Sequence, residues 1–314
     1  MDELSRVVVG LLHGNGEGFF APVGNLSNRT LIGFLLQGAH ESHVYDMSAN
    51  GIAVGNATGG TTAVTWTQSS GIQELPTPRG ASGARTITSD GNHIGGFFAN
   101  QQTGSVSAGT WDWNGSEWNP SPLNPLDGLS QVLHGSSDGY YLGGTRNFNA
   151  TAWIDGVFQE ILLDGLALNG EVRAVTDDGF FFGTGYFPSF DDVRGFIWHH
   201  TWPEAMTIRE YELWSIGYDI GRDYVEVNGA TSSGGFLYLT GYPAFVLKTP
   251  ALATPGCCDV TCDSIFDMHD FATLQNGFGT SSGALRIDGD LDGDGDVDLA
   301  DATTLINSLG DSCP

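Results

Sequence analysis

The sequence predicts a mainly β protein, a β-propeller, followed by a small all-α calcium module at the C-terminal end. Three observations predict this fold class. The N-terminal part of the chain repeats loosely with a period of roughly 40 to 56 residues. The composition, with 46 glycines, 18 phenylalanines, 9 tyrosines and 8 tryptophans among 314 residues, suits many short strands and tight turns. Finally, an acidic loop pattern occurs twice near the C-terminus.

Each N-terminal repeat begins with a small polar turn that ends in glycine, and Asp-Gly and Asn-Gly supply the positive φ of hairpin turns. An apolar strand ending in glycine follows, and later a strand that ends in an aromatic residue. The turns are Ser48–Gly51, Ser89–Gly91, Ser137–Gly139, Asp177–Gly179 and Ser233–Gly235. The strands after them are Ile52–Gly55, His93–Gly96, Tyr141–Gly144, Phe180–Gly183 and Leu237–Gly241, with Val7–Gly10 as a sixth copy. The aromatic ends are Phe20, Trp66, Trp111, Trp153, Trp198 and Phe245.

One small sheet cannot bury both of its faces, whereas sheets stacked radially bury them and leave only short edges. We therefore predict that residues 1–248 form a β-propeller. Six blades is the favoured number; five or seven blades, and a β-sandwich, are the alternatives. The repeated Trp or Phe is expected to pack between blades.

Residues 249–256, rich in Pro, Ala and Thr, form the predicted linker. The restricted φ of its two prolines makes it a short extended segment. Residues 257–314 are then a separate module.

The second acidic loop, residues 290–301, has the spacing of a calcium-binding loop. Ca²⁺ takes six to eight oxygen ligands at about 2.3–2.6 Å, and a 12-residue loop wraps one ion around a glycine at position 6, here Gly295. An acidic, solvated turn is the alternative interpretation. The predicted side-chain ligands are Asp290, Asp292, Asp294, Asp298 and Asp301, and Asp296 contributes a backbone carbonyl.

The first acidic loop lies 31 residues earlier and is poorer in ligands. Thr261 replaces a carboxylate at position 3, and Ser264 replaces the glycine at position 6, where a left-handed conformation costs about 1 kcal/mol. We therefore expect two Ca²⁺ sites, the second tighter than the first. The predicted ligands of the first site are Asp259, Thr261, Asp263, Asp267 and Asp270 by side chain and Ile265 by its carbonyl.

An apolar stripe at helical spacing follows each loop. We expect two helices that bury these stripes against each other. The stripes are Phe271, Leu274 and Phe278 after the first loop and Ala302, Leu305 and Leu309 after the second.

The duplicated pattern resembles a type I dockerin over residues 257–314. The resemblance implies an EF-hand-like, calcium-dependent fold that docks onto a cohesin-like or other surface protein. Dockerins of the cellulosome type usually carry Ser-Thr at loop positions 10 and 11, where this chain has Leu299-Ala300 and Met268-His269. The resemblance therefore still implies the calcium-binding fold. It does not identify the protein to which the module docks.

The N-terminal repeats resemble the HAF-type extracellular repeats of bacteria. Val44–Ser48, Gly51–Gly55 and Ala63–Trp66 carry this resemblance best. It implies a secreted, propeller-like protein and supplies no catalytic residues. Such repeats with a dockerin-like tail resemble secreted proteins of planctomycete-type bacteria.

The net charge and the positions of the cysteines limit the possible partners and the cellular compartment. The formal net charge of −26 disfavours nucleic acid and anionic membranes as partners, and no stretch is long enough to span a bilayer. All four cysteines, Cys257, Cys258, Cys262 and Cys313, lie in the C-terminal module, which indicates disulfides of open connectivity and an oxidising compartment. No signal peptide is visible, so a secreted protein is expected to have a longer or trimmed N-terminus.

No catalytic motif stands out. The pairs Asp177-Asp178 and Asp191-Asp192 cannot be placed across a cleft as a glycosidase requires, and His40–His43 and His199-His200 lack further metal ligands. Trp111 and Trp113 share one face of a strand, either as core or as a sugar-stacking surface. We predict a secreted or surface-displayed, non-enzymatic binding or scaffold protein attached through its calcium module. A carbohydrate-active enzyme or a carbohydrate-binding propeller is the alternative.

Overall fold

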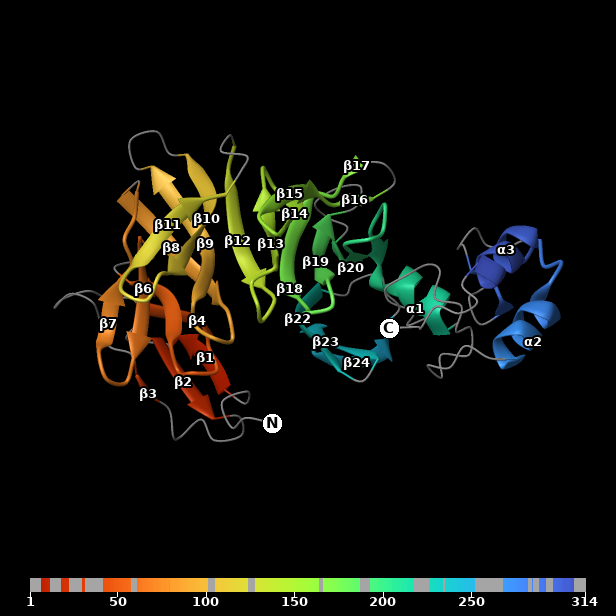
Figure 1. Cartoon of the computed structure of the whole chain (residues 1–314), viewed down its shortest axis with the longest axis horizontal. Coiled ribbons are helices and arrows are strands. Elements are labelled where there is room, and N and C mark those ends of the chain that lie inside the picture. Colours follow the sequence, from red (N-terminus) through yellow and green to blue (C-terminus); the bar gives the residue numbers. More distant parts are fainter. Residues whose placement is uncertain are drawn as a thin grey trace. The chain divides into compact units, whose positions relative to one another are not determined.

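The structure, a computed structural model, describes residues 7–11, 18–22, 30–31, 42–57, 61–78, 80–100, 105–123, 128–163, 166–186, 193–216, 226–233, 235–251, 268–281, 284, 288–291 and 296–307. The chain divides into two compact units, Met1–Glu160 and Ile161–Pro314. In the described residues of both units, antiparallel strands that follow one another in the chain form most of the structure (Figure 1).

Four sheets make up the described part of the first unit, and each is a meander of consecutive strands. The first sheet is β1 (Val7–Leu11), β2 (Gly18–Pro22) and β3 (Thr30–Leu31). The second is β4 (Ser42–Met47), β5 (Ala53–Ala57), β6 (Thr62–Thr67) and β7 (Gly71–Glu74). The third is β8 (Gly80–Ile87), β9 (His93–Asn100), β10 (Val106–Trp113) and β11 (Trp118–Pro122). The fourth is β12 (Ser130–Gly135), β13 (Tyr141–Arg146), β14 (Asn149–Ile154) and β15 (Val157–Glu160).

The second unit contains two larger sheets, a small hairpin and three helices among its described residues. The hairpin is β16 (Leu162–Leu163) and β17 (Leu166–Ala167). The larger sheets are β18 (Gly170–Val175), β19 (Phe180–Tyr186), β20 (Val193–His199) and β21 (Met206–Thr207), then β22 (Glu226–Ser233), β23 (Phe236–Tyr242) and β24 (Phe245–Pro250). The helices are α1 (Ile208–Ile216), α2 (Met268–Gly277) and α3 (Leu299–Asn307).

Within each unit, successive sheets pack through their first strands. In the first unit β1 contacts β4, β4 contacts β8, and β8 contacts β12; in the second unit β18 contacts β22 (Figure 1). Each of these sheets therefore behaves as a propeller blade, with one strand against the preceding sheet and its last strand at the outer edge. The described residues contain six sheets of three or four strands, the number of blades that the repeats favour.

Four of the six aromatic residues that close the repeats are buried, and Trp111 and Trp153 cluster with residues of the preceding sheet as expected. Phe245 is only partly buried, and the side chain of Phe20 lies outside the described residues. Trp66, Trp111, Trp153 and Trp198 are all less than a tenth exposed. Trp111 meets the ring of Phe98 edge-on at a centroid distance of 4.7 Å, in a cluster that includes Val54 of the second sheet. The indole N–H of Trp111 donates to the carbonyl of Pro76 at 2.6 Å, so its burial leaves no polar atom unpaired.

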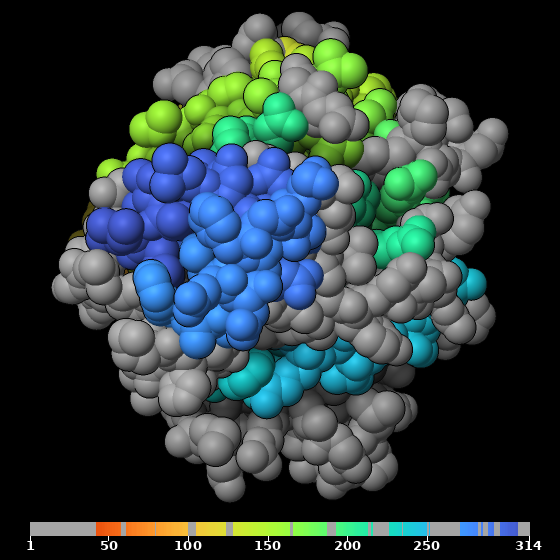
Figure 2. Space-filling view, turned by 90° about the vertical axis from the view of Figure 1, so that its right-hand side faces the viewer, coloured from red at the N-terminus to blue at the C-terminus, as the bar shows by residue number. Residues whose placement is uncertain are grey.

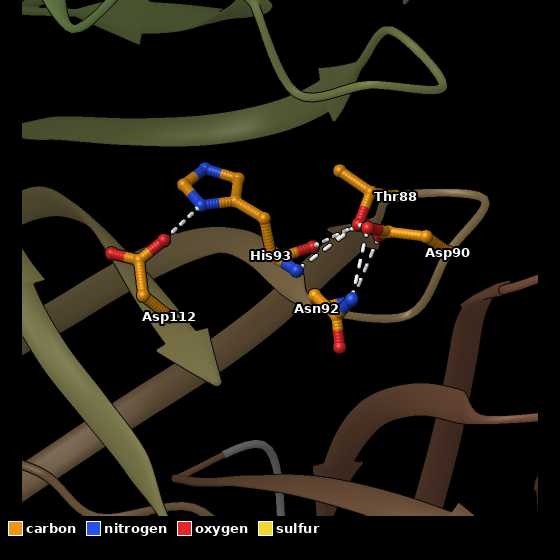
Figure 3. A network of polar contacts seen from close by, with 5 residues as sticks. All are labelled: Thr88, Asp90, Asn92, His93 and Asp112. Carbon is orange, nitrogen blue, oxygen red and sulfur yellow. Dashed lines mark hydrogen bonds and ion pairs between the residues drawn. The ribbon is translucent and has the colours of Figure 1, made fainter. Parts of the chain in front are cut away.

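The turns between the first two strands of the blades share a hydrogen-bond pattern. In the turn shown in Figure 3, Thr88 Oγ1 donates to Asp90 Oδ1 at 2.6 Å and accepts the N–H of His93 at 3.0 Å. The hydrogen bonds from Thr88 and from the N–H of Asn92 hold the pKa of Asp90 below its ordinary value. Gly91 has φ +75°, a backbone conformation that residues with a side chain rarely adopt. The hydroxyl two residues before the Asp or Asn recurs at Ser48, Thr88 and Ser136, and only Ser48 was part of a predicted turn.

These turns also connect neighbouring blades of the first unit. The N–H of Ala49 donates to Ser89 O at 3.0 Å, and the N–H of Ser89 donates to Ser137 O at 2.7 Å. Asn50 Nδ2 adds a bond to Asp90 O at 2.8 Å. The repeated turn therefore fixes each hairpin and also aligns it with the next one.

Substitution of Ser136 by alanine tests this role. Its buried hydroxyl donates to Asp138 at 2.7 Å and accepts the N–H of Tyr141 at 3.0 Å. We expect Ser136→Ala to lower the free energy of unfolding by about 1–3 kcal/mol, because a buried N–H loses its acceptor. Urea denaturation measures this change. The exposed Ser70→Ala is the control, and equal stability of the two variants would contradict the proposed role of the turn.

A β-bulge recurs in the first strand of each blade from β4 to β22. The extra residues are Tyr45, Arg85, Leu133, Arg173 and Asn228. In the first unit, the guanidinium of Arg85 lies 4.0 Å from the centroid of the Tyr45 ring. In the second unit, Arg173 Nη1 donates to Asn228 Oδ1 at 2.7 Å. Bulges redirect side chains, and here they bring the extra residues of adjacent blades into contact.

Asp46, the residue after the first bulge, ties β4 to β8. Its Oδ2 accepts the N–H of Ile87 at 2.8 Å and the hydroxyl of Thr86 at 3.0 Å. Burial raises the pKa of Asp46, and these hydrogen bonds and the charge of His134 oppose that rise. Burial lowers the pKa of His134, although the carboxylate of Asp46 acts in the opposite direction.

Helix α1 carries a buried carboxyl group. The helix begins with a capping box, in which Glu210 Oε2 accepts the N–H of Thr207 at 2.7 Å and the N–H of Glu210 donates to Thr207 Oγ1 at 3.2 Å. Glu212 follows and is fully buried. Burial raises the pKa of Glu212 above its ordinary value of 4.5, and the hydroxyl of Thr249 in β24 opposes this rise only in part.

This raised pKa predicts a pH-dependent stability. The folded protein holds the proton of Glu212 more tightly than the unfolded chain does, so this proton contributes to the free energy of unfolding. The contribution is complete below pH 4.5 and is lost as the pH rises through the pKa of Glu212 in the folded protein. Glu212→Gln keeps the group neutral and should remove this loss. We expect the variant to be the more stable protein at high pH in thermal unfolding between acidic and alkaline buffers. The exposed Glu74→Gln controls for net charge, and parallel pH profiles for wild type and Glu212→Gln would refute the prediction.

Candidate metal centre

The second acidic loop brings three carboxylates together at the start of α3, with Asp301 in the first turn of the helix. Oxygen atoms of Asp296, Asp298 and Asp301 all lie within 4.8 Å of one another. Two ligands of one Ca²⁺ ion, each at about 2.3–2.6 Å from it, are at most roughly 5 Å apart. The three oxygens are therefore spaced closely enough to share one ion.

Two of these carboxylates are held by backbone hydrogen bonds. Asp301 is fully buried; its Oδ1 accepts the N–H of Leu291 at 2.6 Å, and its Oδ2 accepts the N–H of Asp298 at 2.7 Å. Asp298 Oδ1 accepts the N–H of Ala300 at 2.6 Å, so Asp298 and Asp301 cap α3 reciprocally. An ionised carboxylate has about four acceptor positions, so these bonds leave lone pairs for a cation.

Helix capping accounts for the positions of the Asp298 and Asp301 carboxylates without a metal. The carboxylate of Asp296 takes no part in the cap. Asp290, at the start of the loop, is 1% exposed. Oxygen-only donors are also the set that Ca²⁺ prefers, so the residues present fit this ion.

The structure describes four of the six ligands predicted for the second site. Asp296, Asp298 and Asp301 are brought together, with the carboxylate of Asp296 joining them although we expected only its carbonyl. Asp290 is buried at the start of the loop. The predicted ligands that lie outside the described residues are Asp292 and Asp294 of the second site and Asp259, Thr261, Asp263, Ile265 and Asp267 of the first. The side chain of Asp270 lies outside them too, so the first site stays a prediction, and so do disulfides at Cys257, Cys258, Cys262 and Cys313.

A small core supports the loop. Leu274 of α2 and Leu305 of α3 are buried together with Leu291 and Val297, as the stripes predict for the two helical leucines. The N–H of Val297 donates to Thr280 O at 2.9 Å, which joins the loop to the segment after α2. The prediction was wrong for the other members of the first stripe, because Phe271 is 46% and Phe278 is 53% exposed. Residues of the connecting segment fill the core in their place.

The other candidate residues are dispersed. Trp111 is buried, whereas Trp113 is 39% exposed. His199 is 3% exposed; burial lowers its pKa to about 4, and its ring centroid lies 4.7 Å from that of Phe180. Asp177 and Asp178 lie exposed in the turn between β18 and β19. His40, Asp191 and Asp192 lie outside the described residues.

Comparison with known proteins bears on the fold. No family model matches the chain, and no curated protein matches it significantly. Among solved structures, the chain is similar to TolB from Acinetobacter baumannii, with a TM-score of 0.50 and 12% identity over 79% of this chain, and it spans 64% of that protein. It is also similar to a streptogramin B lyase, with a TM-score of 0.50 and 13% identity over 79% of this chain and 80% of that one. Both are β-propellers, and these similarities together with the meander sheets show that the chain has a β-propeller fold.

Proposed function

We propose that this chain is a secreted, non-enzymatic β-propeller whose C-terminal module binds Ca²⁺ and attaches the propeller to a protein partner. The observation that carries the proposal is the meeting of Asp296, Asp298 and Asp301 beside the buried Asp290. The same residues occupy the ligand positions of a calcium loop. When bound, Ca²⁺ would neutralise these charges and order the loop, so metal binding is coupled to folding of the module.

The surface of the module supports attachment. Figure 2 shows α2 and α3 as adjacent surfaces, in agreement with the contacts between them. On α3, Leu299 and Ile306 are 72% and 59% exposed, although two other residues of the same helix, Ala302 and Leu305, face the core. Leu299 and Ile306 are seven residues apart and so lie on one side of the helix. A protein partner that covers this side would bury both.

Secretion has indirect support. No helix among the described residues is both long and apolar enough to cross a membrane. The cysteines of the module favour an oxidising compartment, and calcium at the concentrations found outside cells would load sites of modest affinity. Catalysis has no support from the described residues beyond the dispersed candidates above.

Calorimetric titration of the full chain with Ca²⁺, after chelator treatment, tests the proposal. We expect two binding events of unequal affinity, and we expect limited proteolysis to cut the region after residue 250 faster in chelator than in Ca²⁺. The absence of binding heat, or equal protease resistance with and without Ca²⁺, would refute the calcium role. A propeller that stays folded in chelator would show that the metal acts on the module alone.

A further inference from the structure

The hairpin between β10 and β11 is longer than the same hairpin in neighbouring blades of the first unit. Strands β6 and β14 each end one residue after the tryptophan that closes the repeat, whereas β10 continues for two residues beyond Trp111. At that second position the neighbouring blades have the exposed polar residues Gln68 and Asp155. This blade has Trp113 there instead, so the fold itself does not require an aromatic residue at this place.

Trp113 forms a pair with Trp118 across the hairpin. The two residues face each other in the strand register, with ring centroids 5.4 Å apart and planes at 54°. Trp113 is 39% exposed and Trp118 is partly exposed. A single exposed aromatic side chain is ordinary, but two adjacent indoles at a blade-specific position form a surface suited to ligand contact.

The pair is held rigidly before any ligand arrives. Asn114 Oδ1 accepts the N–H groups of Ser116 and Glu117 at 2.9 and 3.0 Å, which fixes the turn. The N–H of Trp113 donates to the carbonyl of Asn92 at 2.9 Å, which joins the hairpin to the turn in Figure 3. A preorganised surface loses little conformational freedom on binding.

Polar groups surround the two indoles. Asn92 is exposed beside Trp113, and its side chain is fixed by a hydrogen bond to Asp90 at 2.9 Å. Glu117 lies in the turn of the hairpin. Asp112, next to Trp113 in β10, points to the other face of the sheet, where it contacts His93 (Figure 3). Apolar ring faces next to amide and carboxylate groups match a pyranose ring, which has apolar C–H faces and hydroxyl groups at its edge.

The negative net charge of the protein favours uncharged sugars over anionic ones as ligands. With 37 acidic and 11 basic residues, the chain repels polyanions such as uronate or sulfated chains. We infer that Trp113 and Trp118 form a binding site for a neutral polysaccharide. This inference deepens the proposed function, because it gives the displayed propeller a ligand class.

Affinity gel electrophoresis of the full chain tests the site, with laminarin, hydroxyethylcellulose or neutral arabinoxylan in the gel and alginate as the anionic comparison. We expect at least one neutral polysaccharide to retard the wild type and alginate to have no effect. Trp113→Ala and Trp118→Ala should each raise the dissociation constant roughly tenfold or more, since a buried aromatic contact is lost. Trp113→Tyr should retain most of the binding.

Phe148→Ser is the matched control, because Phe148 is also an exposed aromatic residue of the first unit, in the turn between β13 and β14. It should leave the retardation unchanged, and circular dichroism should show that all variants are folded. Unchanged mobility of the wild type with every neutral polysaccharide would overturn the inference, as would equal binding by Trp113→Ala or equal loss in Phe148→Ser. Retardation should persist in chelator, so failure of this site and failure of the calcium proposal are separate results.

Discussion

Trp111→Ala is expected to lower the free energy of unfolding by about 3–5 kcal/mol, the range for truncation of a buried aromatic residue. The indole is fully buried and contacts Phe98 in a cluster with residues of the neighbouring sheet. The substitution leaves a cavity between two blades and removes the donor to the carbonyl of Pro76. Since stabilities of whole domains are only about 5–15 kcal/mol, the first unit should be close to unfolding. Urea denaturation monitored by circular dichroism gives the change.

Trp113→Ala is the matched control for this experiment. It removes the same side chain two residues further along the same strand, where 39% of the residue is exposed. Its effect on stability should be much smaller, while its effect on polysaccharide binding should be the larger of the two. Equal destabilisation by both substitutions would show that the hairpin tip belongs to the core and would argue against the stacking surface.

Asp301→Ala is expected to abolish binding at the tighter calcium site. Asp301 is fully buried and its two oxygens accept the N–H groups of Leu291 and Asp298. Without the carboxylate, the loop loses a predicted ligand, and the N–H groups of the buried Leu291 and the exposed Asp298 lose their acceptor. The loss at the buried N–H costs about 1–3 kcal/mol even in the absence of metal. Calorimetry should show only the weaker binding event, and α3 should be cut by protease whether or not Ca²⁺ is present.

The exposed Asp288→Ala separates a specific effect from a change in net charge, because Asp288 lies two residues before the loop. This variant should bind Ca²⁺ as the wild type does. If Asp301→Ala retained both binding events, the three carboxylates would be a helix cap only, and the calcium proposal would lose its main support.

Much of the propeller could be predicted because a repeat displays the same signals several times. The Asp-Gly and Asn-Gly turns, the glycine-ended strands and the closing tryptophans each mark one blade. The bulges were not predictable, since Tyr45, Arg85 and Asn228 have no residue type in common. A bulge depends on pairing between strands, and nothing in the local sequence of these strands marks it.

For the candidate metal centre, the sequence spacing was the stronger guide. The 12-residue spacing predicts that the side chains of Asp298 and Asp301 lie close to each other and to the carbonyl of Asp296, and in the structure the three carboxylates lie within 4.8 Å. Binding of Ca²⁺ by this cluster stays a prediction. Which helix faces are buried was predicted only in part. Helical spacing places Phe271 and Leu274 on one stripe, but a short helix buries only the turn that its neighbours reach.

The sequence by itself determined the fold class, the four buried tryptophans that close repeats, and the spacing of the acidic loop, because these follow from local periodicity. Only the tertiary structure decided which of two tryptophans on one strand face is core and which is surface. It also placed the carboxyl of Glu212 inside the second unit and brought the extra residues of adjacent bulges into contact. The burial of a side chain depends on how far its strand or helix extends past the neighbouring element. Packing between segments that are remote in sequence sets that extension.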